Sequence, residues 1–312
     1  MQNLKTRVAI TPFLFLTVAS AAMATPSFHS SLTRAVKAIG NEASDEDRTY
    51  SWSLPSIVQS GLVESGISVF GSETYAAFHG RTFELRQEQV KLGLFDQLEL
   101  IYGRQFVHAQ GRMASSKFYD DEDHYGARFV VKKPTDEDPS AWSLQFEAMR
   151  PGTAQISSGS NAETLAGPGI NTYAVNYGDR SNFQYQAAYT SIDAPLIDAH
   201  SASVSVGHDL RIASDAWARL QATLVGQSFS GAGESSNFQL REVVSGYVAW
   251  NPIRWLSVEG GITVFPSGAP FVSGEFTSVS SFAVYNPGGV VNDLRNDFSA
   301  FGTLVVMAHW KF

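Results

Sequence analysis

Apolar and polar residues alternate along most of the chain after residue 57. In residues 141–150, for example, every second side chain is apolar and most of those between are polar. The apolar set there is Trp142, Leu144, Phe146 and Ala148. A period of two belongs to a β-strand, because successive side chains of a strand point to opposite faces. An apolar face opposed to a polar but seldom charged face is typical of a transmembrane barrel, with lipid outside and water inside.

The alternating segments predict about twelve strands, and bacterial single-chain barrels have even strand numbers. We expect the strands at 59–70, 74–93, 97–108, 124–133, 141–150, 171–178, 182–190, 200–208, 216–228, 238–250, 255–265 and 298–312. Short polar turns alternate with longer loops between them, as periplasmic turns and external loops do in outer-membrane barrels. A soluble secreted sandwich would not show this alternation. The predicted fold class is all-β, a transmembrane antiparallel up-and-down β-barrel over residues 56–312.

The N-terminal residues have the three-part layout of a secretory signal peptide. Lys5 and Arg7 precede an uncharged apolar run, and Ala22 and Ala24 provide the small residues of a cleavage site. The run is shorter than the roughly 20 residues that a membrane-spanning helix needs. We therefore expect residues 1–24 to be a signal peptide, removed on export. Residues 25–55 are expected to form a periplasmic leader or a short plug helix, with a mobile linker as the alternative.

Composition narrows the possible functions. The sequence contains Cys 0, so it offers neither disulfides nor thiol chemistry. Its formal net charge of -8 argues against nucleic acid as a partner. After the N-terminal run, no uncharged apolar stretch approaches the length of a membrane-spanning helix. A membrane location would therefore require a closed barrel, because only helices and barrels satisfy their backbone in lipid.

The chain ends in "VVMAHWKF", with an aromatic residue at the last position. Counting back from that residue, one face of the expected last strand is apolar: Phe312, Trp310, Ala308, Val306 and Leu304. This ending resembles the C-terminal signature of bacterial outer-membrane proteins. The resemblance implies that these residues are an assembly signal read by the barrel-assembly machinery. It also implies a location in the cell outer membrane, in contact with its lipid and lipopolysaccharide.

A second resemblance covers roughly residues 55–106. The residues that carry it are Gly61, Glu64, Gly66, Arg81, Arg86, Gly93, Leu94, Asp96, Leu98, Glu99 and Leu100. They look like the opening of a broad group of outer-membrane transporters described by similarity to a phenol-degradation meta-pathway protein. The resemblance implies transport but names no substrate.

Charged residues on the polar faces of the expected strands are candidate pore-lining residues. They are Glu99, Arg128, Lys132, Glu147, Arg219, Arg241 and Glu259. Charges of both signs suit a water-filled pore, and they also suit a lumen cross-linked by ion pairs. Arg128 and Glu147 flank the predicted turn at 134–140 symmetrically, so we expect them to face each other.

The favoured function is an outer-membrane channel or transporter that passes small solutes through a polar lumen. Residues 266–297 are expected to form its longest loop, a constriction or lid. The alternative is a structural or adhesive barrel with a plugged lumen. An outer-membrane lipid hydrolase is less favoured, because the chain has no HExxH or GxSxG motif. It would need a serine within reach of a histidine on the lipid face.

We expect no enzymatic activity, no cofactor and no metal site. One acidic segment invites a metal interpretation: Asp120, Asp121, Glu122, Asp123 and His124. Clustered carboxylates can bind divalent cations that bridge lipopolysaccharide phosphates. The spacing matches no known calcium loop, so a solvated loop at the outer rim is the favoured interpretation.

Replacing Phe312 with serine should reduce insertion into the outer membrane far more than replacing His309 with serine. The physical reason is that Phe312 lies on the predicted lipid face, whereas His309 lies on the predicted lumen face. The measurement is the amount of each variant in isolated outer membranes. Equal amounts would contradict this assignment of faces.

Overall fold

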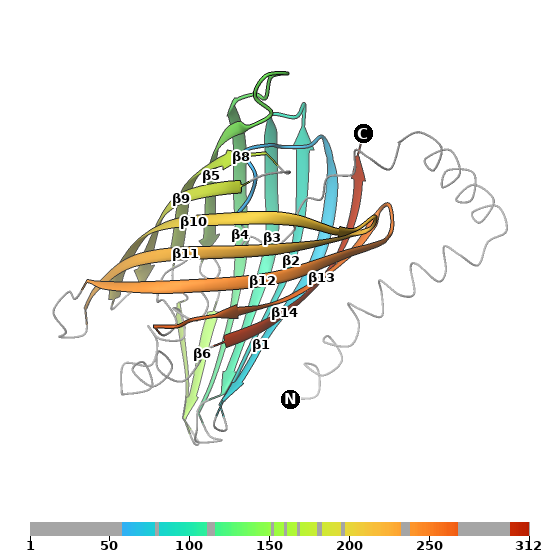
Figure 1. Cartoon of the computed structure of the whole chain (residues 1–312). Coiled ribbons are helices and arrows are strands. Elements are labelled where there is room, and N and C mark those ends of the chain that lie inside the picture. The colour runs from blue at the N-terminus through green and yellow to red at the C-terminus, as the bar shows by residue number, and fades with distance from the viewer. Residues whose placement is uncertain are drawn as a thin grey trace. The chain divides into compact units, whose positions relative to one another are not determined.

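The computed structural model describes residues 58–78, 81–110, 116–150, 153–158, 161–166, 169–179, 183–194, 197–231, 238–267 and 300–311. The expected signal peptide, the 25–55 segment, most of the 266–297 loop and Phe312 lie outside these ranges. The described residues form one antiparallel sheet that closes on itself (Figure 1). Among them, no helix is long and apolar enough to cross a membrane.

Fourteen strands make up the sheet. They are β1 (Gly66–Phe78), β2 (Arg81–Leu94), β3 (Leu98–Gln110), β4 (Ser116–Lys132), β5 (Ala141–Arg150), β6 (Thr153–Ser158), β7 (Asn161–Ala166), β8 (Gly169–Gly178), β9 (Phe183–Ala194), β10 (Ile197–Ala213), β11 (Ala216–Gly231), β12 (Gln239–Ile253), β13 (Leu256–Val264) and β14 (Ala300–Lys311).

Twelve of these strands form the barrel wall. Pairing runs from β1 to β5, continues from β8 to β14, and closes between β14 and β1. The short strands β6 and β7 form a hairpin beyond the wall, and β6 pairs with the first residues of β4. The predicted fold class is therefore confirmed: the protein is a closed antiparallel barrel of twelve strands.

The two ends of the barrel differ in their connections. At the end that holds the start of β1 and the end of β14, five short connections link β2–β3, β4–β5, β8–β9, β10–β11 and β12–β13. We call this the turn end, and the opposite end the loop end. The predicted strict alternation of short and long connections is wrong. At the loop end, only two residues separate β1 from β2 and β9 from β10.

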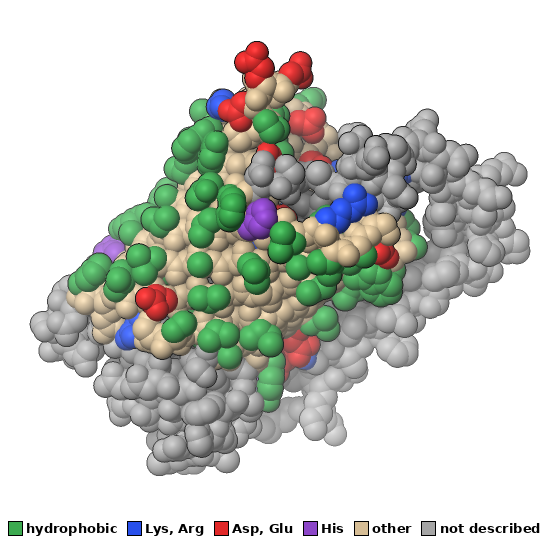
Figure 2. Space-filling view, in the orientation of Figure 1, with side chains coloured by type: hydrophobic (Ala, Val, Ile, Leu, Met, Phe, Trp, Pro, Cys, Tyr) green, Lys and Arg blue, Asp and Glu red, His purple; other side chains and the backbone are tan. Residues whose placement is uncertain are grey.

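The outer face of the wall is apolar. Figure 2 shows hydrophobic side chains spread over the outer face of β10 to β13. Side chains with large exposed fractions include Leu144, Val204, Leu220, Ile262 and Leu304. Aromatic pairs lie near the turn end, including Trp142–Tyr177 with 4.7 Å and Trp255–Trp310 with 6.4 Å between ring centroids. An apolar band with aromatic side chains at its edge is the surface of a barrel that crosses a lipid bilayer.

Several strand predictions differ from the structure, and two of the differences bear on the lumen. The first strand was expected at 59–70, but β1 starts at Gly66 and residues 58–65 are not part of the wall. Residues 58–61 are all buried, so this segment lacks the alternation of a wall strand. The fourth strand was expected from 124, but β4 starts at Ser116 and contains the acidic segment. Charged residues can occupy a strand where they find partners inside or outside the barrel.

Replacing Leu220 with arginine should destabilise the protein by about 2–4 kcal/mol, the cost of an arginine on the lipid face near the bilayer midplane. Leu220 is 62% exposed on β11. The measurement is a urea titration of the protein refolded in lipid vesicles, with Leu220→Phe as the matched apolar control. A free energy of unfolding that is unchanged by Leu220→Arg would contradict the placement of this face in lipid.

Candidate functional site: the barrel lumen

Residues 58–65, which we call the strap, lie inside the barrel near its turn end. They precede β1 and belong to no strand. Val58, Gln59, Ser60 and Val63 are all buried. Their partners come from the inner faces of β4, β8 and β11, so the strap crosses between opposite parts of the wall. The lumen at this end therefore contains protein.

The inner end of the strap is held by two side chains of β11. Arg219 Nη1 donates to the carbonyl oxygen of Val58 at 2.7 Å. The amide of Val58 donates to Gln221 Oε1 at 2.8 Å. Both polar groups of the Val58 backbone are thus satisfied by side chains, as a buried segment outside any sheet requires.

Arg219 also belongs to a buried ion pair. Its Nη2 donates to Asp209 Oδ2 at 2.6 Å, and its Nε contacts the other carboxylate oxygen. The same Nη2 donates to Gln184 Oε1 at 2.6 Å, and Gln184 Nε2 donates to Asp209 at 3.1 Å. The arginine and aspartate side chains are only 1% and 5% exposed. A charge buried this deeply is tolerable only because it is paired and hydrogen bonded.

The middle of the strap is held by β4 and β8. Arg128 Nη1 donates to the carbonyl oxygen of Ser60, and its Nη2 donates to Glu99 Oε2, each at 3.3 Å. The amide of Gly61 donates to the carbonyl oxygen of Gly178 at 3.1 Å. A side chain at Gly61 would collide with the carbonyl of Ala141, so the strap backbone lies directly against the wall.

The outer end of the strap is fixed at the turn between β2 and β3. The Ser65 amide donates to Asp96 Oδ1 at 2.7 Å, and the Asp96 amide donates to Ser65 Oγ at 2.9 Å. The Glu64 carboxylate pairs with the Lys311 ammonium group at 2.6 Å. The backbone carbonyl of Glu64 lies so close to Gly93 that a Cβ at position 93 would collide with this carbonyl. Gly61, Glu64, Gly93 and Asp96 thus have a shared structural role in seating the strap. All four belong to the transporter-like segment of the sequence.

Hydrogen-bonded polar side chains, most of them carboxamides, lie on the inner face of β1 to β5, β8 and β9. We call this set the amide belt. One part links Ser72 to Gln87, Gln87 to Gln105, and Gln105 to Glu122, over 3.3, 2.7 and 3.1 Å. A second part continues from β2 to β9: Gln89, His124, Glu147, Gln145, Asn176 and Gln186. Each bond joins side chains of different strands or neighbouring positions on one face, so the belt ties the inner wall together.

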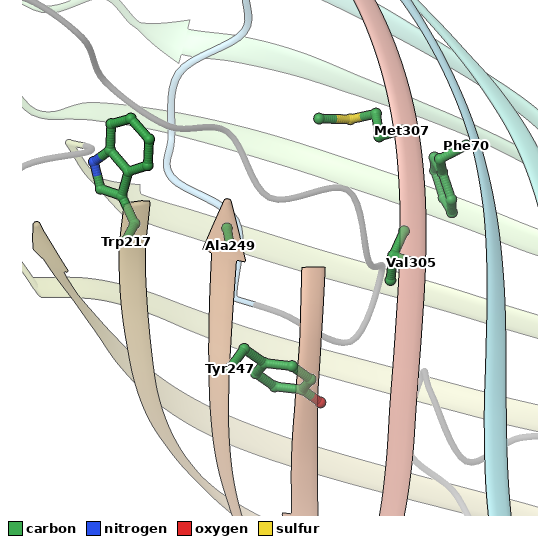
Figure 3. Packing of buried hydrophobic residues seen from close by; sticks show 6 residues of the cluster. All are labelled: Phe70, Trp217, Tyr247, Ala249, Val305 and Met307. Carbon is green, nitrogen blue, oxygen red and sulfur yellow. The ribbon is translucent and has the colours of Figure 1, made fainter. Parts of the chain in front are cut away.

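Another part of the inner wall is apolar. Figure 3 shows Phe70, Trp217, Tyr247, Ala249, Val305 and Met307, which come from β1, β11, β12 and β14. Polar inner faces were expected along the strands, so this apolar cluster was not predicted. A period of two separates the two faces of a strand, but it does not show which of two largely apolar faces turns inward.

Most of the predicted pore-lining charges do face the lumen. The side chains of Arg128, Arg219 and Glu259 are buried there, and Glu99 and Glu147 are nearly so. Arg241 is partly exposed on β12 and bonds to Gln239 Oε1 at 3.0 Å. Of the expected assembly residues, Leu304, Val306 and Trp310 expose their side chains on the outer face, and Ala308 is partly exposed. Their recognition by the assembly machinery stays a prediction.

The predicted contact between Arg128 and Glu147 is wrong. Arg128 lies opposite Gln145 in the ladder, and Glu147 lies opposite Gly126. The register shifts by one residue between Val130 and Lys132, and the register on neither side of this shift places Arg128 opposite Glu147. Arg128 pairs with Glu99 of β3, and the Glu147 carboxylate lies 2.9 Å from His124 Nε2.

Lys132 is at the turn end and does not line the interior. Its ammonium group contacts Asp138 Oδ2 at 2.6 Å in the β4–β5 connection, and both side chains are largely exposed. Hydrogen bonds from Lys132 and Ser140 lower the pKa of the Asp138 carboxyl to about 2. This pair therefore organises a turn and is not part of a pore.

The acidic segment of β4 is not a loop at the outer rim. Glu122 and His124 are buried on its inner face, whereas Asp123 faces outward and lies 3.6 Å from Arg104. The alternation of the strand thus divides these residues between two environments. Within the described ranges, no group of three or more His, Cys, Asp or Glu side chains is placed to hold a metal ion.

Histidines on the outer face bear on the lipid-hydrolase alternative. His200 contacts the hydroxyl of Tyr189 at 2.9 Å, and its cross-strand partners are Ser191 and Ser228. The serine–histidine hydrogen bond that the structure shows, Ser68 with His309 at 3.2 Å, joins inward faces of β1 and β14. His200 is therefore positioned by a tyrosine, and its hydrogen bond is not to a serine.

Comparisons with known proteins give weak similarities to other barrels. No protein-family model and no curated protein matches the chain. The translocator domain of the autotransporter NalP from Neisseria meningitidis is 7% identical over 94% of this chain and 98% of that one, with a TM-score of 0.46. The NanC porin is 9% identical over 78% of this chain and 98% of that one, with a TM-score of 0.42. OmpT, an outer membrane protein of Vibrio cholerae, is 9% identical over 78% and 97%, with a TM-score of 0.35. Similarities of this size carry no argument about activity.

Replacing Arg219 with glutamine should destabilise the protein by about 3–5 kcal/mol, because it leaves Asp209 as an unpaired buried charge. The double variant Arg219→Gln with Asp209→Asn should recover much of this loss, since it removes both charges. Urea titrations of the wild type, both single variants and the double variant measure the coupling. Strictly additive effects would contradict a mutually dependent ion pair.

Proposed function

We propose that the protein is a channel of the bacterial outer membrane that passes small solutes through its lumen. The observation that carries this proposal is the amide belt, an inner wall of hydrogen-bonding side chains contributed by most strands from β1 to β9. Carboxamides and hydroxyls can exchange hydrogen bonds with a polar solute that has lost part of its water. A barrel of about twelve strands is narrower than a porin of 16 to 18 strands, so only small solutes fit.

Other features support the outer membrane as its location. The exposed outer face is apolar, the N-terminal residues resemble a signal peptide, and the C-terminal residues resemble the assembly signal of outer-membrane proteins. The proposal includes membrane lipid and lipopolysaccharide as surroundings and the barrel-assembly machinery as a partner during biogenesis. The transporter-like segment at residues 55–106 supports transport as the class of function.

The channel should discriminate only weakly between anions and cations. Arg219 is paired with Asp209, and Arg128 is paired with Glu99, so neither offers a net charge to a passing ion. Arg241 is the cation of the predicted set that remains partly exposed on the inner face, near the loop end of β12. Its hydrogen bonds go to the neutral groups Gln239 Oε1 and the Ser267 carbonyl. Arg241 is therefore the residue at which a substitution best tests how the electric field in the lumen acts on passing ions.

The plugged structural or adhesive barrel is the second candidate, and the strap is the observation that favours it. Val58 and Val63 are 1% and 4% exposed within the turn end of the barrel. Conductance across a planar bilayer separates the two functions. The channel proposal expects discrete openings from the refolded full chain, whereas the plugged barrel should insert and give none.

Replacing Arg241 with glutamine should move the reversal potential in a salt gradient toward cation preference, because it removes a positive charge that favours anions. The shift should shrink in concentrated salt, since the Debye length falls from about 10 Å at 0.1 M to about 3 Å at 1 M. Arg104→Gln is the matched control, because Arg104 faces outward and pairs with Asp123. The same reversal potential in wild type and Arg241→Gln would remove this arginine from the pathway.

A further inference from the structure

The two arginines that bind the strap, Arg219 and Arg128, have their counter-charges in the barrel wall and not in the strap. If the strap left, Arg219 would keep its bonds to Asp209 and Gln184, and Arg128 would keep Glu99. Losing the only partner of a buried charge is strongly unfavourable, whereas losing one carbonyl among several partners is a smaller change. Both guanidinium groups therefore keep a counter-charge from the wall with or without the strap.

The two ends of the strap are held in different ways. The hydrogen bonds given above for its inner end and its middle use strap backbone groups: the Val58 amide and carbonyl, the Ser60 carbonyl and the Gly61 amide. None of these residues belongs to a strand, so no ladder reinforces them. The outer end has the ion pair of Glu64, the two bonds of Ser65, and direct continuation into β1. The outer end is the natural hinge.

Buried apolar side chains lie at both ends of the strap, Val58 at the inner end and Val63 toward the hinge. Val63 packs with Val130 and Ala141, with Leu62 beside them. Towards the inner end, Gln59, Ser60 and Gly61 form a polar and small stretch, with Val58 beyond it. Such residues gain little from burial, and their amide and hydroxyl groups would be solvated by water after release. Release of the inner end would expose the buried Val58 side chain, and its freed backbone groups would be solvated by water.

We propose that the strap is a gate of the turn end, closed in this structure. Its inner end, Val58–Gly61, releases from Arg219, Gln221 and Arg128, while Glu64 and Ser65 remain at the hinge. This inference rests on the proposed channel function, because a gate regulates passage through the lumen that the strap crosses. A strap that is simply part of the folded wall would open only when the barrel unfolds.

The absence of cysteine from the sequence makes the release measurable in the full chain. Val58→Cys is treated with a membrane-impermeant maleimide after refolding in vesicles. The buried control is Ala249→Cys, which is 0% exposed on β12, and the accessible control is Asp136→Cys in the exposed β4–β5 connection. If the open state has a population of about 0.1–10%, Val58→Cys should react about 10- to 1,000-fold more slowly than Asp136→Cys. Ala249→Cys should stay unmodified.

A second comparison tests the contacts at the inner end. Gln221→Leu, added to Val58→Cys, removes the acceptor of the Val58 amide and should accelerate the labelling. Gln227→Leu is the matched control, a buried glutamine on the same strand whose bond goes to Gln239. Equal acceleration by both substitutions would overturn the assignment of the inner end as the released part.

Conductance then links release to passage. In the Val58→Cys, Gln221→Cys variant, a reducible bis-methanethiosulfonate reagent joins the strap to β11. Openings should disappear after cross-linking and return after reduction. Equal conductance in the joined and reduced forms would overturn the gate. Protection of Val58→Cys equal to that of Ala249→Cys would overturn it as well. Labelling of Val58→Cys without conductance in any form would support release of the strap and refute the proposed channel.

Discussion

A chain that crosses lipid in an extended form has to satisfy its backbone polar groups within its own wall, because the hydrocarbon offers no hydrogen-bonding partners. Closure between β1 and β14 meets this requirement for the sheet. The closed sheet then has two unlike faces, and each faces a different solvent. On the outer face, side chains such as Leu220 and Val306 are exposed to lipid without cost. Inside, every polar group has to find water or a partner.

The lumen meets this second requirement with side-chain networks. Arg219 with Asp209 and Arg128 with Glu99 compensate charges that are almost fully buried. The amide belt does the same for neutral groups, and Gln87, Gln105, Gln145 and Asn176 each both donate and accept. The strap has no sheet partner, so it takes its hydrogen bonds from these networks. Arg219 and Arg128 thus both stabilise the wall and hold the strap in the lumen.

The two arginines make two kinds of contact: ion pairs within the wall, and hydrogen bonds to the strap. The ion pairs belong to the wall alone, since both members come from its strands. The bonds to Val58 and Ser60 are additional ones made by the same guanidinium groups. A plug that supplied the only counter-charge would be locked in place, because its departure would leave a buried charge unpaired. The strap supplies no counter-charge to Arg219 or Arg128, so its departure would leave neither of these buried charges unpaired. The structure is therefore compatible with both candidate functions, the channel and the plugged barrel.

The alternation of apolar and polar residues predicts the class of fold and the face to which many side chains point. A period of two identifies strands and faces, and it placed Leu304, Arg219 and Glu259 on the correct sides. It could not determine which residues meet, because contacts depend on register, and the ladder places Arg128 opposite Gln145 and not opposite Glu147. It also did not separate the strap from a strand, because the sequence of residues 58–65 does not show whether they pair with a neighbouring strand. The backbone contacts at Gly61 and Gly93, the burial of His124 and the apolar part of the lumen are properties of the tertiary structure. They arise because the closed sheet brings the inner faces of strands that are distant in sequence, and residues 58–65, close together, and no local pattern records this closure.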